Sequence, residues 1–271
     1  MSPAPVPSNF CRLELRGVSR LYPARRGGKS VQALYDVSLR IGKGEFVCLL
    51  GQSGCGKSTL LGLLAGLDSP SSGSVLWNGA EIRGPEPGRM LMFQEAALFP
   101  WLNVVENVMF GMNVRREWSQ RERRERALTW LETVGLGNFT AFRVHELSGG
   151  MRQRVALARA LAPEPEVLLM DEPFSALDAM SRERLYADIQ RIWEGSGTTV
   201  VMVTHNVREA VCLGTRIVLM AAEPGRVIDD LGVVLSRPRD MNDVELARVA
   251  TEVNARLQAT LVNFDGEGAK T

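Results

Sequence analysis

Apolar and polar residues alternate in two segments near the start of the chain, Phe10 to Leu15 and Val37 to Ile41, and this alternation predicts two β-strands. Between them, Ala24 to Ser30 is rich in Gly and Arg, which indicates a turn and therefore an antiparallel pair. Three prolines within residues 1–9 exclude a helix there, so we expect a disordered tail.

A third strand and a helix follow in close succession. Glu45 to Leu50 is a nearly continuous apolar run, which is typical of a strand buried on both faces of a parallel sheet. A glycine-rich loop comes next, and four leucines between residues 60 and 64 then lie at helical spacing. We expect this helix to end at Gly66.

The middle of the chain has a helical pattern. Ser119 and Glu122 form a capping box ahead of an apolar stripe that ends at Gly135, and a further helix is predicted over Met151 to Leu161. Arginines on the first of these helices raise the possibility of nucleic acid binding. They alternate with glutamates, however, and mixed charge is more typical of a solvated helix face.

The second half of the chain contains a β-α-β unit. Apolar runs at Val167 to Met170 and Thr199 to Val203 predict strands, and Ser181 to Trp193 predicts the helix between them. Beyond Ala222 the pattern weakens, although Val244 to Leu261 predicts one more helix.

Composition limits the classes of protein to consider. A chain of 271 residues that is 45% hydrophobic and 23% charged suits a globular protein with one substantial core. Lys+Arg 32 against Asp+Glu 31 leaves a formal charge of +1, so no overall field attracts nucleic acid or an acidic membrane. No apolar run approaches the roughly 20 residues of a membrane-spanning helix, and the start does not resemble a secretory signal, so we expect the protein in the cytosol.

The segment GQSGCGKS at residues 51–58, here called the phosphate loop, carries the strongest signal for chemistry. It fits G-x-x-x-x-G-K-[ST] and lies between a buried strand and a helix, as such a loop must. Inward backbone N–H groups would hold phosphate oxygens, Lys57 would reach the β- and γ-phosphates, and Ser58 would ligate magnesium. The simpler alternative is a tight turn followed by a surface lysine.

Two adjacent carboxylates, Asp171 and Glu172, follow the apolar strand at Val167 to Met170. This places them at the carboxyl edge of the sheet, where ligands of α/β folds bind. Asp171 suits a magnesium ligand, and Glu172 would activate or orient a water molecule for attack on the γ-phosphate. Taken alone, such acids more often cap the next helix.

The tetrapeptide LSGG at residues 147–150, here called the signature segment, opens a second helix. Its free N–H groups and the helix dipole would also face an anion. If this were the only motif, a serine N-cap with a glycine turn would explain it. Together with the phosphate loop it resembles the ATP-binding cassette (ABC) ATPases. In that family LSGG closes over ATP held by the phosphate loop of the opposite subunit.

The resemblance covers roughly residues 10–225. It implies an α/β fold with a RecA-like phosphate-loop core, an N-terminal antiparallel β region and an inserted helical subdomain at about residues 94–162. Residues 226–271 would then form a C-terminal extension, partly helical.

The resemblance also implies roles for single residues. Gln94 would contact the metal and the attacking water, and His205 would contact the γ-phosphate. The catalytic set is then Glu172, His205 and Gln94, and the metal set is Ser58, Gln94 and Asp171. The nucleotide-binding set is Tyr22, Gly51, Gln52, Ser53, Gly54, Cys55, Gly56, Lys57, Ser58, Thr59, Ser148, Gly149, Gly150 and Asp178.

Two members of that set have roles of their own. Tyr22 would stack on adenine, although Arg25 and Arg26 lie close by in sequence and would serve instead of the ring or beside it. Asp178 would cross the dimer seam. Because Cys55 lies in the phosphate loop beside Lys57, we also expect it to react with maleimide faster than the other cysteines, and MgATP to protect it.

Within the family, FQE at residues 93–95 and LFPW at residues 98–101 are similar to the importers for nitrate, alkanesulfonates and taurine. In related importers the region Gln94 to Asn107 receives a coupling helix of the membrane subunit, and exposed apolar residues at 98, 99 and 101 would supply contact for it. An equally open alternative is that these residues are core of the helical subdomain.

Two positions depart from the commonest family pattern. Met151 replaces the usual Gln after LSGG, and Asn206 replaces the usual Asp after His205. Neither change removes a group that contacts phosphate in the family, so we expect activity to survive. The loss of a negative charge beside His205 would alter how that histidine is held.

The resemblance therefore implies the ATP-hydrolysing subunit of an importer for a small anionic solute. Two copies would enclose two MgATP, and separate permease subunits with an extracytoplasmic solute-binding protein would complete a transporter at the cytoplasmic face of the membrane. We expect no nucleic acid partner. A soluble cassette ATPase that remodels nucleic acid or ribosomes fits less well, because such proteins commonly carry two cassettes or a coiled-coil insertion, and no sustained heptads occur here.

Overall fold

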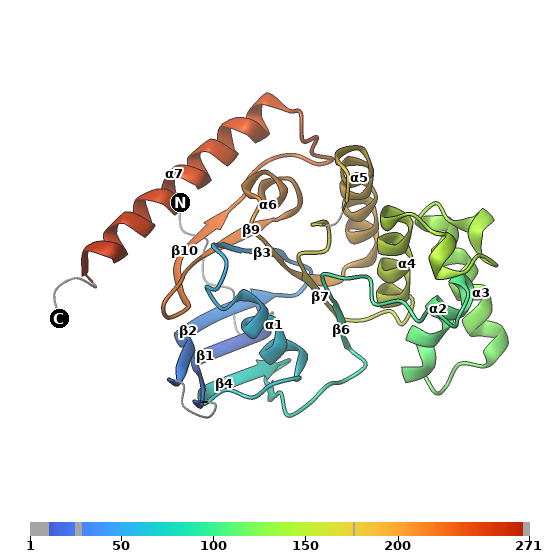
Figure 1. The fold of residues 1–271 in the computed structure, drawn as a ribbon, viewed down its shortest axis with the longest axis horizontal. Helices are drawn as coiled ribbons and strands as arrows, with labels where there is room; N and C mark the ends of the chain where they lie inside the picture. Colours follow the sequence, from blue (N-terminus) through green and yellow to red (C-terminus); the bar gives the residue numbers. More distant parts are fainter. Residues whose placement is uncertain (1–10, 25–28, 176, 268–271) are drawn as a thin grey trace. The chain divides into compact units, whose positions relative to one another are not determined.

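The computed structural model describes residues 11–24, 29–175 and 177–267. They divide into two compact units (Figure 1). Unit 1 comprises Met1–Pro85 and Thr199–Thr271, and unit 2 comprises Glu86–Thr198. The predicted N-terminal tail lies outside the described residues.

The described residues of unit 1 form two sheets and three helices. Its strands are β1 (Cys11–Tyr22), β2 (Val31–Gly42), β3 (Phe46–Gly51), β4 (Ser72–Trp77), β5 (Ala80–Glu81), β8 (Thr199–Thr204), β9 (Arg216–Ala221) and β10 (Arg226–Gly232). Its helices are α1 (Lys57–Ala65), α6 (Val207–Leu213) and α7 (Val244–Glu267).

The first sheet of unit 1 confirms the predicted antiparallel pair. Its strand order is β2-β1-β4-β5, and Leu13 of β1 lies opposite Ile41 of β2, with both side chains buried. Both strands are longer than predicted. β1 pairs with β2 on one side and β4 on the other, and several register shifts along these pairings interrupt the alternation that a sequence pattern detects.

The second sheet of unit 1 holds the strand that precedes the phosphate loop. Its strands follow the order β10-β9-β3-β8, and β3 runs parallel to both β8 and β9. All six residues of β3 are buried, because strands flank it and helices cover it, which explains its continuous apolar run. The phosphate loop therefore starts from a fixed point in the core.

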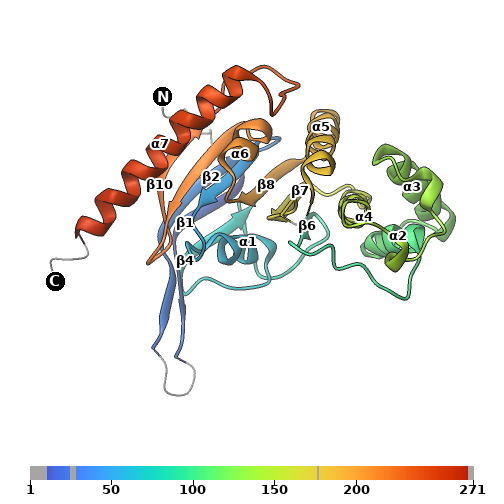
Figure 2. The same cartoon turned by 45° about the horizontal axis from the view of Figure 1, so that its top comes forward.

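Helix α1 packs on β3 and β8 and also contacts β2. Figure 2 shows α1 near β8 and β2. Its four leucines are buried, as their spacing predicts. The helix ends where expected, because Gly66 adopts φ 76° and its N–H bonds to the carbonyls of Gly62 and Leu63.

Helix α7 packs on α6 and β9, and both views show it beside α6 (Figures 1 and 2). A single buried stripe, Leu246, Ala250, Val253 and Leu257, holds it to the rest of unit 1. The helix predicted from Val244 is thus confirmed, and it continues to Glu267. Among the described residues, no helix combines the length and apolar character needed to cross a membrane.

Unit 2 is mostly helical. It contains the parallel strands β6 (Arg89–Met92) and β7 (Val167–Asp171), the helices α2 (Val104–Gly111), α3 (Gln120–Thr133), α4 (Gly149–Leu161) and α5 (Ala179–Ser196), and the short 3₁₀ helices η2 (Met112–Val114), η3 (Gly137–Phe139) and η4 (Val144–Glu146). Helices α2, α3 and α4 pack on one another. Helices α3, α4 and α5 confirm the predicted helices to within three residues at each end.

Helix α2 was not predicted from the sequence. It begins at a capping box in which the Asn103 side chain accepts a bond from the Glu106 N–H and the Glu106 carboxylate accepts one from the Asn103 N–H. The signal was therefore present as Asn-x-x-Glu, but the helix has only 8 residues, too few for a clear apolar period.

Candidate nucleotide-binding site

The phosphate loop adopts a backbone that requires glycine. Gly54 and Gly56 have φ of 82° and 85°, in the left-handed region. A Cβ at Gly56 would also come within 2.6 Å of Leu34 Cδ2 and 2.7 Å of the Ala33 carbonyl oxygen. The loop is therefore held against β2 and turns its N–H groups in a way that other residues would not permit.

Lys57 is the first residue of α1, and its side chain is buried. Its Nζ donates hydrogen bonds to the carbonyl oxygens of Gly51 and Gln52, both at 2.7 Å, and contacts Cys55 Sγ at 3.5 Å. The ammonium group thus lies at the centre of the loop. A positive charge at this point, followed by the N-terminus of a helix, forms an anion-binding site.

The remaining loop residues are open to ligands. Gln52, Ser53 and Ser58 are exposed, and Thr59 is half-buried. Ser58 lies in the first turn of α1, directly after Lys57. Its hydroxyl is thus next to the predicted phosphate position, as the assignment to magnesium requires.

Cys55 corrects one prediction. Its side chain is fully buried, at 0% exposure, and its sulfur lies beside Lys57 Nζ. Fast reaction with maleimide requires access as well as a reactive thiolate, so the burial argues against the expected rapid labelling. Cys48 and Cys212 are buried as well.

Tyr22 ends β1 and is held by two polar contacts. Its Oη donates to Asp68 Oδ2 at 2.8 Å, and the Arg20 guanidinium lies 4.5 Å from its ring centroid. Arg20 also pairs with Asp68 at 2.7 Å, so three side chains form one cluster. Arg25 and Arg26, the alternatives for nucleotide contact, lie outside the described residues.

His205 follows β8 and is exposed. The next residue, Asn206, is the N-cap of α6, and its Oδ1 accepts a hydrogen bond from the Glu209 N–H at 3.2 Å. Asn is among the best N-capping residues, as is the Asp that commonly stands here in the family. The departure therefore keeps the helix start that fixes the backbone beside His205.

In unit 2, Asp171 is the last residue of β7 and Glu172 follows it. Glu172 has φ 41°, which is uncommon for a residue with a side chain and costs of order 1 kcal/mol or more. The turn is stabilised at Ser175, whose N–H and Oγ–H both donate to the Glu172 carbonyl oxygen, at 3.3 and 3.0 Å. A strained backbone at the predicted water-activating carboxylate is a feature of functional sites.

Gln94 is brought to the same turn. Its side chain is exposed, and its Nε2 donates to Ser175 Oγ at 3.3 Å. Its backbone carbonyl accepts a bond from Nε2 of Gln153 at 3.0 Å. Sequence reasoning did not single out Gln153, although a polar residue within the apolar face of α4 was a signal that could have identified it.

The signature segment forms the N-terminus of α4. Ser148 is the N-cap, and its Oγ accepts a bond from the Met151 N–H at 3.3 Å. The capping bond uses only the backbone of Met151, so the departure from Gln leaves it intact. Ser148 and Gly149 are exposed, so a second helix N-terminus faces solvent. Gly150 lies closer to its neighbours, because a Cβ there would be 3.3 Å from Ser181.

Asp178 is the N-cap of α5, where its Oδ1 accepts the Ser181 N–H at 2.9 Å. The bonds from Ser181, through its side chain and its backbone, lower the pKa of Asp178. The carboxylate is therefore ionised and exposed at a helix start. Ala176, two residues before Asp178, lies outside the described residues.

Aromatic residues of unit 2 cluster between Gln94 and α2. Phe99 lies 5.4 Å from Trp101 and 4.3 Å from Phe110, measured between ring centroids. Trp101 is 69% exposed, whereas Leu98 and Phe99 are only half-buried. We call Phe99, Trp101 and Phe110 the aromatic patch; it is partly packed against α2 and partly presented to solvent.

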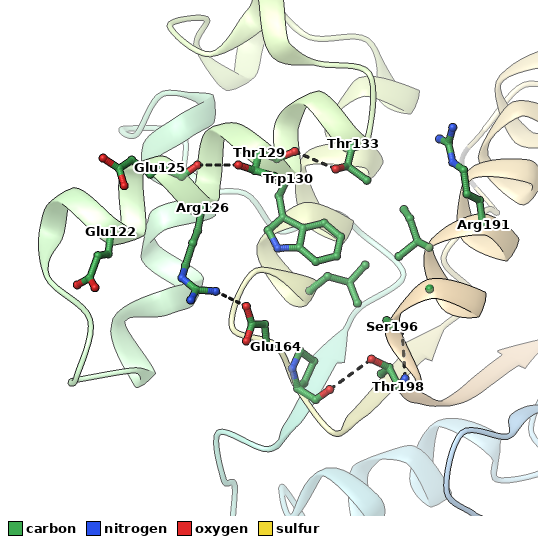
Figure 3. Close-up of a pocket in the computed structure, with 14 residues that line it drawn as sticks. Glu122, Glu125, Arg126, Thr129, Trp130, Thr133, Glu164, Arg191, Ser196 and Thr198 are labelled. Atoms are coloured by element: carbon green, nitrogen blue, oxygen red, sulfur yellow. Dashed lines mark hydrogen bonds and ion pairs between the residues drawn. The ribbon is translucent and has the colours of Figure 1, made fainter.

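A separate cavity of about 880 Å³ lies between α3 and α5 (Figure 3). Trp130 lines it together with polar side chains, and the Arg126–Glu164 ion pair spans one side. None of its lining residues belongs to the predicted site. The mixed charges of α3 flank this cavity, and exposed Arg121 pairs with exposed Glu125 at 2.8 Å, as a solvated face predicts.

The predicted site residues thus occupy both units. Unit 1 carries the phosphate loop, Tyr22 and His205, and unit 2 carries Gln94, Asp171, Glu172, the signature segment and Asp178. Within unit 2 the structure joins Gln94 and Glu172 through Ser175. A phosphate loop between a parallel strand and a helix, with paired carboxylates after another strand, defines a nucleotide-hydrolysing α/β protein.

Comparison with known proteins identifies which class of nucleotide-hydrolysing protein this is. Residues 34–175 match the family described as ABC transporter. The taurine import ATP-binding protein TauB of Burkholderia pseudomallei is 48% identical over 219 residues, covering 81% of this chain and 83% of that protein. The nitrate import ATP-binding protein NrtD of Synechocystis is 45% identical over 223 residues, covering 82% and 83%.

Among solved structures, the ATP-binding cassette MJ0796, in a dimeric post-hydrolysis state bound to ADP and Pi, is similar with a TM-score of 0.73 and 33% identity. The match covers 83% of this chain and 100% of that one. The chain belongs to the ATP-binding subunits of ABC transporters. It binds ATP and is an ATPase, and the predicted ABC ATPase fold is confirmed.

Proposed function

We propose that two copies of this chain enclose two MgATP and that hydrolysis drives an importer for a small anionic solute. The observation that carries the proposal is the presence of two glycine-rich helix N-termini suited to anions in one chain: that of α1 after the phosphate loop and that of α4 at Ser148. A monomeric phosphate-loop enzyme needs only the first. The dimeric cassette MJ0796 supports the arrangement.

In this proposal each ATP contacts two chains. Lys57 and the loop N–H groups hold the phosphates from one chain, and Ser148 and Gly150 close over them from the other. Tyr22 stacks on adenine, and Asp178 lies at the seam. ATP thereby links the two copies.

Magnesium would be held by oxygen ligands. The donor set fits it, because Mg²⁺ takes hydroxyl, amide and carboxylate oxygens and keeps several waters and phosphate oxygens. The Ser58 hydroxyl is exposed beside the loop, Asp171 offers a carboxylate at a strand end, and Gln94 turns its Nε2 to Ser175, which leaves Oε1 as the ligand atom. Bound Mg²⁺ neutralises charge on the β- and γ-phosphates.

Glu172 would activate or orient the attacking water. Water oxygen bonds to the γ-phosphorus while the bond to the bridging β–γ oxygen breaks, and the water's proton passes to the Glu172 carboxylate or to phosphate. His205 contacts the γ-phosphate. The products are two anions that repel each other and no longer join the copies, so the dimer opens.

Permease subunits would receive that motion through the region Gln94 to Asn107. The aromatic patch supplies exposed apolar surface of the kind that binds a partner helix, with Trp101 at its most exposed point. The cassette would then be peripheral, at the cytoplasmic face of the membrane, with a solute-binding protein on the other side. The solute class follows from the taurine and nitrate importers that the chain resembles.

Uptake measurements test this function. In the source organism with the gene deleted, uptake of labelled taurine or labelled nitrate should fall, return with the wild-type gene, and remain low with Glu172→Gln. The exposed Glu183→Gln in α5 is a matched control that should restore uptake. Uptake of both solutes unaffected by the deletion would contradict the assigned solute class.

A further inference from the structure

Gln153 makes an unusual connection inside unit 2. It lies on α4, five residues after Ser148, and its side chain is 2% exposed. Its Nε2 donates to two backbone carbonyl oxygens, that of Gln94 at 3.0 Å and that of Pro173 at 2.6 Å. These carbonyls belong to two segments that are far apart in sequence, and each carries a residue proposed to act in hydrolysis.

A second connection runs alongside the first. The Gln94 side chain donates to Ser175 Oγ, which in turn donates to the Glu172 carbonyl oxygen. Gln94 is therefore joined to the Glu172 turn through both its backbone and its side chain. Since Glu172 has φ 41°, the turn is held in a conformation that needs such support.

The environment of Gln153 argues against a role in packing alone. Its neighbours on the buried face of α4 are apolar, namely Val155, Ala156, Leu157 and Ala160. Its Oε1 is buried and accepts no hydrogen bond from the described residues. An aliphatic side chain would fill the position without an unsatisfied acceptor, so the value of glutamine here lies in the two bonds that Nε2 donates.

We propose that Gln153 is a positioning residue for ATP hydrolysis. It fixes the backbone of Gln94 to that of Pro173, which follows Glu172, so that the metal ligand and the water-activating carboxylate keep a fixed position relative to each other. Because α4 begins at Ser148, the same helix that closes over ATP also fixes this relative position. The inference rests on the roles proposed above for Gln94 and Glu172.

The central test is Gln153→Met in the full chain. Methionine matches glutamine in length and removes both donors and the unsatisfied acceptor. We expect kcat for ATP hydrolysis to fall roughly 10- to 100-fold, as small misplacements of catalytic groups do. The Kd of a fluorescent ATP analogue, measured with the hydrolysis-deficient Glu172→Gln background, should stay within about twofold of the same background without the substitution, since the phosphate loop is untouched.

A matched control separates positioning from structure. Gln190 in α5 is equally buried, at 1%, and lies about 18 Å along that helix from Asp178. The kcat of Gln190→Met should stay within about twofold of the wild-type kcat, even if the substitution lowers the melting temperature. Equal losses of kcat in Gln153→Met and Gln190→Met would overturn the proposal, because both would then reflect general loosening of the fold.

A double-mutant cycle tests whether Gln153 acts through Gln94. Gln94→Ala removes the side chain that Gln153 positions but leaves the bond to the Pro173 carbonyl, so adding Gln153→Met to Gln94→Ala should lower kcat by a smaller factor than Gln153→Met does alone. Full multiplication of the two effects would overturn the proposal. If Gln94→Ala alone leaves kcat unchanged, the role proposed for Gln94 fails and the positioning role of Gln153 fails with it. If Gln94→Ala lowers kcat but Gln153→Met does not, only the positioning role of Gln153 is rejected.

Discussion

Lys57 Nζ lies 2.7 Å from the carbonyl oxygen of Gly51, six residues earlier, so the lysine side chain folds back over the phosphate loop to which it belongs. The ammonium group is thereby fixed at the loop's centre before any ligand contributes to its position. Such preorganisation reduces what must be ordered when phosphate binds.

The first prediction concerns this lysine. Lys57→Met should raise the Kd for ATP roughly 10- to 100-fold, because a hydrogen bond to a charged group contributes about 1.5–3 kcal/mol. Titration of a fluorescent ATP analogue measures it. Lys43→Met, which removes an exposed lysine elsewhere in unit 1, should leave the Kd unchanged. Equal affinities of the two variants would remove Lys57 from the binding site.

Gly56, the N-cap of α1, and Gly62, within that helix, should respond in opposite ways to substitution by alanine. Gly56→Ala should destabilise the protein and abolish ATP binding, because φ is 85° and a Cβ would lie 2.6 Å from Leu34 Cδ2. Gly62→Ala should stabilise it by up to about 1 kcal/mol, since the position is helical and open. Urea denaturation of both variants provides the comparison, and a tolerated Gly56→Ala would contradict the loop geometry.

Ser148 and Ser119 offer a matched pair for the signature segment. Both are exposed serine N-caps in unit 2, of α4 and α3, so each alanine variant should cost about 1 kcal/mol of stability. Only Ser148→Ala should also reduce kcat at saturating ATP, by about tenfold or more, because Ser148 alone is proposed to contact ATP. Identical kcat values for the two would leave Ser148 as a cap and nothing more.

Stability should depend on pH through Glu14. Hydrogen bonds from Arg16 at 2.7 Å and from Arg40 at 2.8 Å lower its pKa, against the opposing effect of burial. Because the folded pKa lies below the unfolded value of about 4.3, the stabilisation is present above that value and is lost as pH falls through the folded pKa. The gap in urea midpoint between wild type and Glu14→Gln should thus be wider at pH 7 than at pH 3. A gap that does not change with pH would contradict the assignment; exposed Glu81→Gln is the control.

Much of the fold could be predicted because its signals are local. The phosphate loop, the leucines of α1 and the capping box of α3 each lie within a few residues of sequence, and each was found in place. Strand lengths could not be predicted so well. β1 pairs on both sides through several register shifts, and only its partners determine where it ends.

The same difference between local and long-range signals applies to the site. Motif residues could be named from spacing, but their connections could not. Gln153 reaches Gln94 across 59 residues and Pro173 across 20, and no sequence period links such positions. The burial of Cys55 has the same origin, because Gly51, Lys57 and the surrounding core enclose the sulfur only once the loop has folded.

The account depends most directly on Glu172. We would measure the mass of Glu172→Gln in solution by light scattering, with and without ATP, alongside the rate of hydrolysis. The account predicts an ATP-dependent shift from monomer to dimer with hydrolysis lost, because ATP that is not cleaved keeps the two copies joined. A protein that stays monomeric with ATP and still hydrolyses it would contradict both the dimer and the catalytic role of Glu172.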